Sequence, residues 1–147
     1  SLPMIGNLVV AILTFYSIYI LSYFIDSNYP IGYFALLAAF MQLLREIIKD
    51  LEDVKGDKKY GCKTFAVVFG QKSAKVLIYA VTALLLLIML YWQWTLQKHI
   101  WSLYALYYLS VIFLVKVYRA NHKSHFTFLS GLLKMMMLVG LSSVIFV

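Results

Sequence analysis

The stretch AKVLIYAVTALLLLIMLYWQW, residues Ala74–Trp94, decides the fold class. It carries a single charged residue, Lys75, and then runs on without another charge to Trp94. Crossing the hydrocarbon core of a bilayer takes about 20 apolar residues in a helix. A surface helix of a soluble protein would show polar residues along one side, and this stretch does not. It therefore predicts a transmembrane helix.

Four further apolar runs of similar length lie on either side of this stretch. They cover Met4–Phe24, Ile31–Ile48, Ile100–Val117 and Phe126–Val147. Because backbone groups cannot stay unpaired in lipid, we expect all of these runs to be helices. The alternation that a transmembrane β-barrel needs is absent from the sequence. The sequence predicts an all-α, polytopic transmembrane helix bundle of about five spans, forming one domain over residues 1–147.

Composition supports the membrane class and argues against several others. Hydrophobic residues make up 63% of the 147 residues and charged residues 13%, whereas soluble domains are about half apolar and a quarter charged. The single Cys62 excludes an internal disulfide. The net charge of +7 does not indicate nucleic-acid binding, because the positive charges lie in short breaks between apolar runs. The opening Ser1-Leu2-Pro3 has no initiating Met, which predicts that Ser1 lies inside a longer protein.

The basic residues predict the orientation in the membrane. Most of them surround the breaks after the second and fourth runs: Arg45, Lys49, Lys55, Lys58, Lys59, Lys63, Lys72, Lys75, Lys116, Arg119 and Lys123. Only Lys98 lies on the opposite side, so the positive-inside rule places the two basic breaks in the cytoplasm. Four aromatic residues then predict a belt at the outer interface: Tyr91, Trp92, Trp94 and Trp101. We expect a multi-pass protein of the plasma membrane.

Acidic residues are concentrated in one segment. Five of the six lie within Glu46–Asp57. If the second helix continues through this segment, four of them fall at i, i+4, i+7 and i+11, within an arc of roughly 60°. We call these four residues the acidic stripe: Glu46, Asp50, Asp53 and Asp57. Glu52 points elsewhere.

The acidic stripe has two interpretations. Like charges at this spacing repel each other by a few tenths of a kcal/mol per pair, and clustered carboxylates are the ligands that hard divalent cations such as Mg²⁺ prefer. Alternatively, charges at the cytoplasmic end of a membrane helix form only a solvated terminus. The shared face, and the use of nearly all the acidic residues of the chain in one place, favour the metal site.

A known family matches this pattern. The spacing Asp50-x-x-Asp53-x-x-x-Asp57, followed by Lys63-Thr64 and Gly70, resembles the second aspartate-rich motif of the UbiA superfamily of intramembrane prenyltransferases. The wording from Arg45 onward is most similar to the digeranylgeranylglyceryl phosphate synthase branch. Members of that branch transfer a geranylgeranyl group to geranylgeranylglyceryl phosphate.

The resemblance to this family extends to both ends of the chain. Gly6-Asn7 is similar to the start of a mid-protein helix of the family, and Lys134 with the following Met135–Met137 and Gly140 is similar to its last helix. The resemblance implies a nine-helix bundle around a central cavity, of which this chain would be the C-terminal part, helices five to nine. The first aspartate motif of the family, Asn-Asp-x-x-Asp in kind, does not occur in this sequence. We therefore expect the chain alone to be inactive.

The resemblance also implies roles for individual residues. Asp50, Asp53 and Asp57 would be the catalytic residues and would hold Mg²⁺ as the cofactor. Lys63, Arg45 and Lys49 would bind the diphosphate of the substrate, with contacts to lipid phosphates as an equal alternative for Arg45 and Lys49. The implied partners are a prenyl diphosphate, a lipophilic acceptor and membrane lipids.

The implied function is Mg²⁺-dependent transfer of a prenyl group, expected to be geranylgeranyl, to a lipophilic acceptor such as geranylgeranylglyceryl phosphate. An aromatic quinone precursor or a porphyrin-type acceptor is the alternative within the family. Two further alternatives are a cation-handling membrane protein and a non-catalytic scaffold. A protein that conducts cations would need carboxylates near the middle of the membrane. We expect Asp50, Asp53 and Asp57 at the cytoplasmic rim of the membrane instead.

Two polar residues inside the apolar runs need separate interpretation. Asn7 favours a hydrogen bond across helices over contact with a ligand. Lys134 lies well inside the last run, where it is either a functional residue or extends its ammonium group toward the interface.

Overall fold

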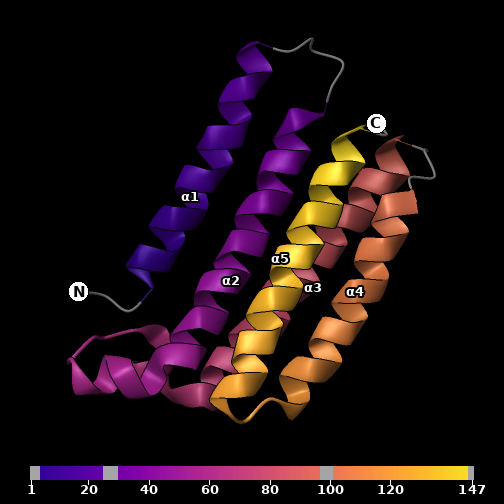
Figure 1. Ribbon diagram of the computed structural model, residues 1–147. Coiled ribbons are helices and arrows are strands. Elements are labelled where there is room, and N and C mark those ends of the chain that lie inside the picture. Colours follow the sequence, from indigo (N-terminus) through magenta and orange to yellow (C-terminus); the bar gives the residue numbers. More distant parts are fainter. Residues whose placement is uncertain (1–3, 25–29, 97–100, 146–147) are drawn as a thin grey trace.

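The computed structural model describes residues 4–24, 30–96 and 101–145, and most of the chain within these ranges is helical. Its elements are α1 (Ile5–Tyr19), the short 3₁₀ helix η1 (Ile20–Tyr23), α2 (Ile31–Lys59), α3 (Phe65–Leu96), α4 (Trp101–Arg119) and α5 (Lys123–Ile145). Figure 1 shows the long helices side by side, with successive ones running in opposite directions. The prediction of an all-α bundle built from five helical spans is confirmed.

Four of the helical segments are long and apolar enough to cross a membrane: Ile5–Tyr23, Ile31–Lys59, Phe65–Thr95 and Lys123–Ser142. The fifth, α4, is a helix of 19 residues and is not among them. Its tyrosines, together with Lys116 and Arg119 in its last turn, lower its mean hydropathy. The chain is thus a membrane protein by length and composition of its helices.

Helix α2 organises the bundle. It contacts α1, α3 and α5, while α4 packs against α3 and α5. Nine residues of α2 are buried, and in its lower half they form one face that includes Leu44, Ile48 and Leu51. By contrast, α1 contacts only α2 and η1 within the described residues. The four helices α2–α5 therefore form the packed unit, and α1 is attached to it through α2.

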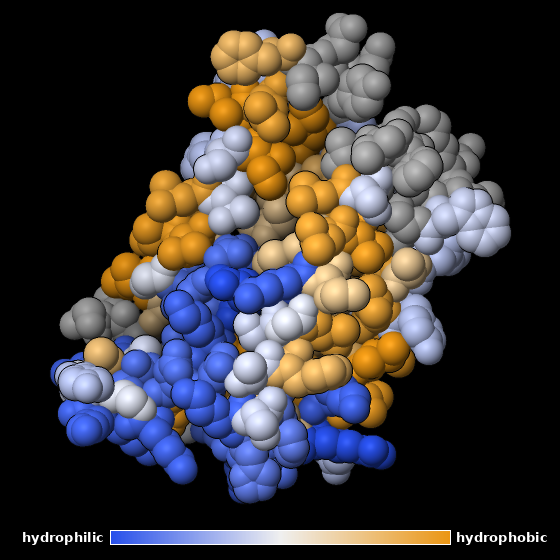
Figure 2. Space-filling model, in the orientation of Figure 1, coloured by the Kyte–Doolittle hydropathy of each residue, from blue (hydrophilic) through white to orange (hydrophobic). Residues whose placement is uncertain are grey.

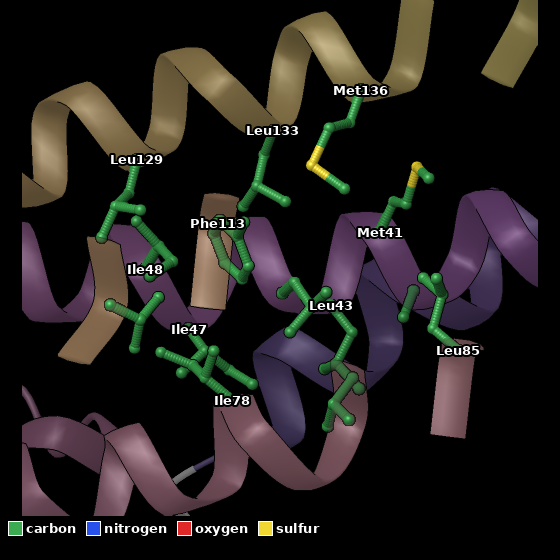
Figure 3. Packing of buried hydrophobic residues seen from close by; sticks show 14 of the residues in the cluster. Met41, Leu43, Ile47, Ile48, Ile78, Leu85, Phe113, Leu129, Leu133 and Met136 are labelled. Atoms are coloured by element: carbon green, nitrogen blue, oxygen red, sulfur yellow. The ribbon is translucent and has the colours of Figure 1, made fainter. Parts of the chain in front are cut away.

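The core lies between α2, α3 and α5. Figure 3 shows Leu129, Leu133 and Met136 of α5 directed toward Ile48 and Met41 of α2. These α5 residues recur at i, i+4 and i+7, which places them on one helix face. All are 3% exposed or less, as is Phe113, which α4 inserts beside them. In lipid, such close van der Waals packing is a principal force that associates helices.

The charged segment between the second and third runs is more helical than the sequence predicts. Helix α2 continues past the second apolar run and through Gly56 to Lys59. Helix α3 begins at Phe65 and bends at Gly70, where φ is 82° and ψ is 167°. A residue with a Cβ is strained at this φ, so the bend requires glycine. The extended α2 carries the whole acidic stripe.

The polarity of the surface changes from one end of the helix bundle to the other. Figure 2 shows hydrophilic residues gathered over the lower part of this face and hydrophobic residues over its upper part. Tyr91, Trp94 and Trp101 are exposed, as expected of an aromatic belt. Trp92 is fully buried, so its prediction as a belt residue is wrong. Its ring stacks on Tyr33 with centroids 5.5 Å apart, and this aromatic contact keeps it in the core.

Candidate acidic site on helix α2

The acidic stripe lies on a single unbroken helix, as its spacing predicts. Glu46, Asp50, Asp53 and Asp57 all belong to α2 and are all half-buried. At about 100° per residue their face is turned away from that of the buried Ile48 and Leu51. The stripe therefore faces outward from the four-helix core, and each of its carboxylates meets a different partner.

Glu46 is held by its own helix. Its Oε1 accepts hydrogen bonds from Gln42 Nε2 at 2.8 Å and from Arg45 Nη1 at 3.1 Å. The Arg45 guanidinium thus lies against the acidic stripe, with 28% of the side chain exposed. In this position it balances a neighbouring carboxylate and lies within about two turns of Asp50.

Asp50 is bound across the interface between two helices. Its Oδ2 accepts a hydrogen bond from Nδ2 of Asn7, in the first turn of α1, at 2.8 Å. Figure 1 shows this end of α1 beside the lower half of α2. The sequence-based prediction that Asn7 bonds across helices is confirmed. Its partner, 43 positions away in the chain, could not be identified from spacing.

Helix α5 contacts the other side of the same segment. Lys123 Nζ lies 3.5 Å from Asp53 Oδ1, and the Thr127 hydroxyl donates a hydrogen bond to Glu52 Oε1 at 2.7 Å. In the sequence, Lys123 contributes only to the predicted orientation, and no pattern there identifies Thr127. Both contacts join residues that are far apart in the chain, so only the fold reveals them.

The ion pair of Lys123 and Asp53 is exposed, with 69% and 47% of the two side chains accessible. Exposed pairs stabilise proteins by about 0–1 kcal/mol. We therefore expect Lys123→Gln to lower the free energy of unfolding by less than about 1 kcal/mol, measured by denaturant titration in detergent micelles. A loss of several kcal/mol would show that this pair fastens α5 to α2.

Asp57 ends the stripe and is tied to the loop that follows α2. The Thr64 hydroxyl donates to Asp57 Oδ2 at 3.3 Å, and the backbone N–H of Cys62 donates to the Asp57 carbonyl at 2.8 Å. Gly61, with φ of 70°, makes this tight return possible. Lys63 lies in this loop, a few residues after Asp57, and the Lys63 side chain is exposed.

The predicted basic residues differ in their surroundings. Lys49 and Lys63 are exposed, and neither forms an ion pair with the residues that the structure describes. Arg45 is engaged by Glu46. Exposed ammonium groups beside a carboxylate stripe are free to meet phosphate oxygens as point charges, so Lys49 and Lys63 remain candidates for anion binding.

The donor set fits Mg²⁺ in kind. Mg²⁺ is usually held by one or two protein carboxylates together with phosphate oxygens and water. Asp50 and Asp53 are such carboxylates. Within the described residues Asp50 accepts a hydrogen bond at Oδ2 alone, and Asp53 forms an ion pair through Oδ1. Over residues 4–24, 30–96 and 101–145, no three acidic, His or Cys residues come together as a complete metal cage. The described residues thus offer part of a coordination shell.

A bundle of membrane-spanning helices with an acidic stripe at one end defines the class of protein: an intramembrane protein with a carboxylate-rich polar site. Residues 1–138 match the model of the UbiA prenyltransferase family, and the chain belongs to this family.

Several curated relatives share the name digeranylgeranylglyceryl phosphate synthase. The relative from Pyrococcus furiosus is 36% identical over 76 residues, covering 52% of this chain and 27% of the relative. The relative from Thermococcus sibiricus is 43% identical over 72 residues, covering 49% and 26%. That from Methanosphaera stadtmanae is 42% identical over 76 residues, covering 50% and 27%. These matches span about a quarter of each relative's length. No solved structure gives a significant match.

Proposed function

We propose that the protein containing this chain transfers a prenyl group from an allylic prenyl diphosphate to a lipophilic acceptor, with Mg²⁺ held at the acidic stripe. The observation that carries the proposal is the stripe itself, because α2 presents Asp50, Asp53 and Asp57 on one face of an uninterrupted helix at the polar end of the bundle. Membership of the UbiA prenyltransferase family supports the reaction class.

Each part of the chain has a role in this proposal. Asp50, Asp53 and Asp57 would hold Mg²⁺, which would supply Lewis-acid stabilisation of the departing diphosphate. Arg45, whose guanidinium balances Glu46, keeps the net charge of the stripe low enough to admit an anionic substrate. The apolar helices enclose the prenyl chain and exclude the water that would quench a developing allylic cation.

The acceptor that we favour is geranylgeranylglyceryl phosphate, because the relatives have a name that specifies this product class. The complete protein in membranes should transfer label from geranylgeranyl diphosphate to this acceptor. Quinone precursors supplied in parallel test the alternative acceptor class. Product with the quinone precursor alone would overturn the acceptor assignment, and no product with any acceptor would contradict prenyl transfer.

Lys63 provides a more local test. Its exposed ammonium lies in the loop directly after Asp57, where it can bind diphosphate oxygens without touching the metal ligands. We expect Lys63→Ala to raise the KM for the prenyl diphosphate about tenfold, the effect of losing roughly one charge-assisted hydrogen bond, with kcat little changed. Lys58→Ala, an exposed lysine on the last turn of α2, is the matched control. An unchanged KM for Lys63→Ala would remove Lys63 from the site.

A further inference from the structure

The hydrogen bond between Asn7 and Asp50 fixes one carboxylate oxygen and leaves the other open. Asn7 Nδ2 lies 2.8 Å from Asp50 Oδ2. An ionised carboxylate only accepts hydrogen bonds, so the NH₂ side of the amide must face it. Within the described residues Asp50 Oδ1 accepts no hydrogen bond. The carboxylate is thus oriented and still has a free coordinating oxygen.

The chemistry of this partner differs from that at the neighbouring carboxylates. Asp53 faces the ammonium of Lys123, and Glu46 faces the guanidinium of Arg45. A cation beside a carboxylate weakens its attraction for a metal ion. The amide of Asn7 is neutral, so it holds Asp50 in place without offsetting its negative charge. Among the acidic residues of the stripe with a side-chain partner on another helix, Asp50 is the one whose partner carries no charge.

The Asn7 side chain is half-buried where α1 meets α2. Just beyond it along α1, Leu8 and Ala11 line an apolar groove of about 420 Å³ between α1 and α2, opposite Leu43. The bond from Asn7 is the only side-chain hydrogen bond that joins α1 to α2 within the described residues. This hydrogen bond between two half-buried side chains restricts the rotamers of Asp50.

We propose that Asn7 is a positioning residue that orients Asp50 as a metal ligand, an inference that rests on the proposed function. Carboxylates that bind metal ions are themselves hydrogen-bonded by outer partners, and removing such a partner weakens metal binding about 10- to 100-fold. Asn7 acts through Asp50 and touches neither the metal nor the substrate. Its role is to hold the Asp50 carboxylate in one orientation through Oδ2 while Oδ1 stays open to a metal ion.

The test measures metal binding directly, with Mn²⁺ as the probe. In the complete purified protein, electron paramagnetic resonance gives the Mn²⁺ dissociation constant of the unaltered form, Asn7→Ala and Asn7→Leu. Leu matches Asn in size and keeps the helix packed if Ala disturbs it. We expect both variants to raise the dissociation constant about 10- to 100-fold. The Mg²⁺ concentration for half-maximal transfer should rise by the same factor, while kcat at saturating Mg²⁺ changes only a few-fold.

Thr14→Ala is the matched control, because the Thr14 hydroxyl donates only to the Val10 carbonyl of its own helix at 2.9 Å. It should leave the Mn²⁺ dissociation constant unchanged. A lower unfolding temperature for Asn7→Leu with an unchanged dissociation constant would show that Asn7 is merely structural and would overturn the inference. Absence of transfer by the unaltered protein would contradict the proposed function instead, so the two failures are distinguishable.

Discussion

Replacing Asp50 with Asn should reduce prenyl transfer by the complete protein at least about a hundredfold at saturating substrate. A Mg²⁺ ion supplies several kcal/mol of transition-state stabilisation, and each 1.36 kcal/mol corresponds to a factor of about ten in rate. The amide side chain would keep the shape of the aspartate but lose the negative charge that attracts the cation. Because Asp50 is half-buried against α1 and its amide replacement can still accept from Asn7, the fold should survive.

Glu52→Gln is the matched control for Asp50→Asn. It makes the same change of charge on the same helix, two residues further along. Glu52 lies off the stripe and accepts its hydrogen bond from Thr127 of α5, so its variant should retain transfer within a few-fold of the unaltered protein. Full activity of Asp50→Asn would exclude Asp50 as a metal ligand. Equal losses in both variants would show that the rate follows the total charge of the segment and not the stripe.

Leu133→Ala should lower the free energy of unfolding by about 2–5 kcal/mol, the range for leucine in a packed core. Leu133 is 0% exposed and lies between α5 and α2, where Figure 3 shows it directed into the core. Truncating the side chain there leaves a cavity and takes away many van der Waals contacts, each small but together large. Unfolding of the complete protein by sodium dodecyl sulfate in mixed micelles gives the free energy.

The same helix provides a control of the same chemistry. Leu138 is 65% exposed and points away from the core, so Leu138→Ala should change the free energy of unfolding by less than about 1 kcal/mol. Equal losses for the two variants would contradict the assignment of the α5 face that packs on α2.

Much of the fold could be predicted because lipid leaves few choices. Apolar runs of about 20 residues must become helices in a bilayer, and the described part of each predicted run is helical. The continuation of α2 to Lys59 was harder to predict, since Gly56 and a dense run of charges favour a break in the helix. The burial of Trp92 could not be predicted from the sequence for a related reason. A position at the membrane interface is predicted from composition, whereas the burial of Trp92 depends on its contact with Tyr33 of another helix.

The sequence predicts how the residues of the candidate site are spaced along one helix, but not which residues of other helices they contact. The spacing of Asp50, Asp53 and Asp57 on α2 follows from the helical repeat, so their common face could be derived from the sequence. Their partners could not, because Asn7 and Lys123 come from helices far away in the chain. Neutral and cationic partners make neighbouring carboxylates inequivalent, and this difference exists only after α1 and α5 have packed against α2.

The central claim is that the acidic stripe carries a Mg²⁺-dependent transfer reaction, and Mg²⁺ withdrawal tests it most directly. Transfer from labelled geranylgeranyl diphosphate is measured with the complete protein in membranes, first in excess chelator and then as Mg²⁺ is returned to millimolar concentration. We predict that product formation stops with the chelator and recovers with Mg²⁺ in the unaltered protein, but does not recover in Asp50→Asn. Undiminished transfer in the chelator would contradict the account.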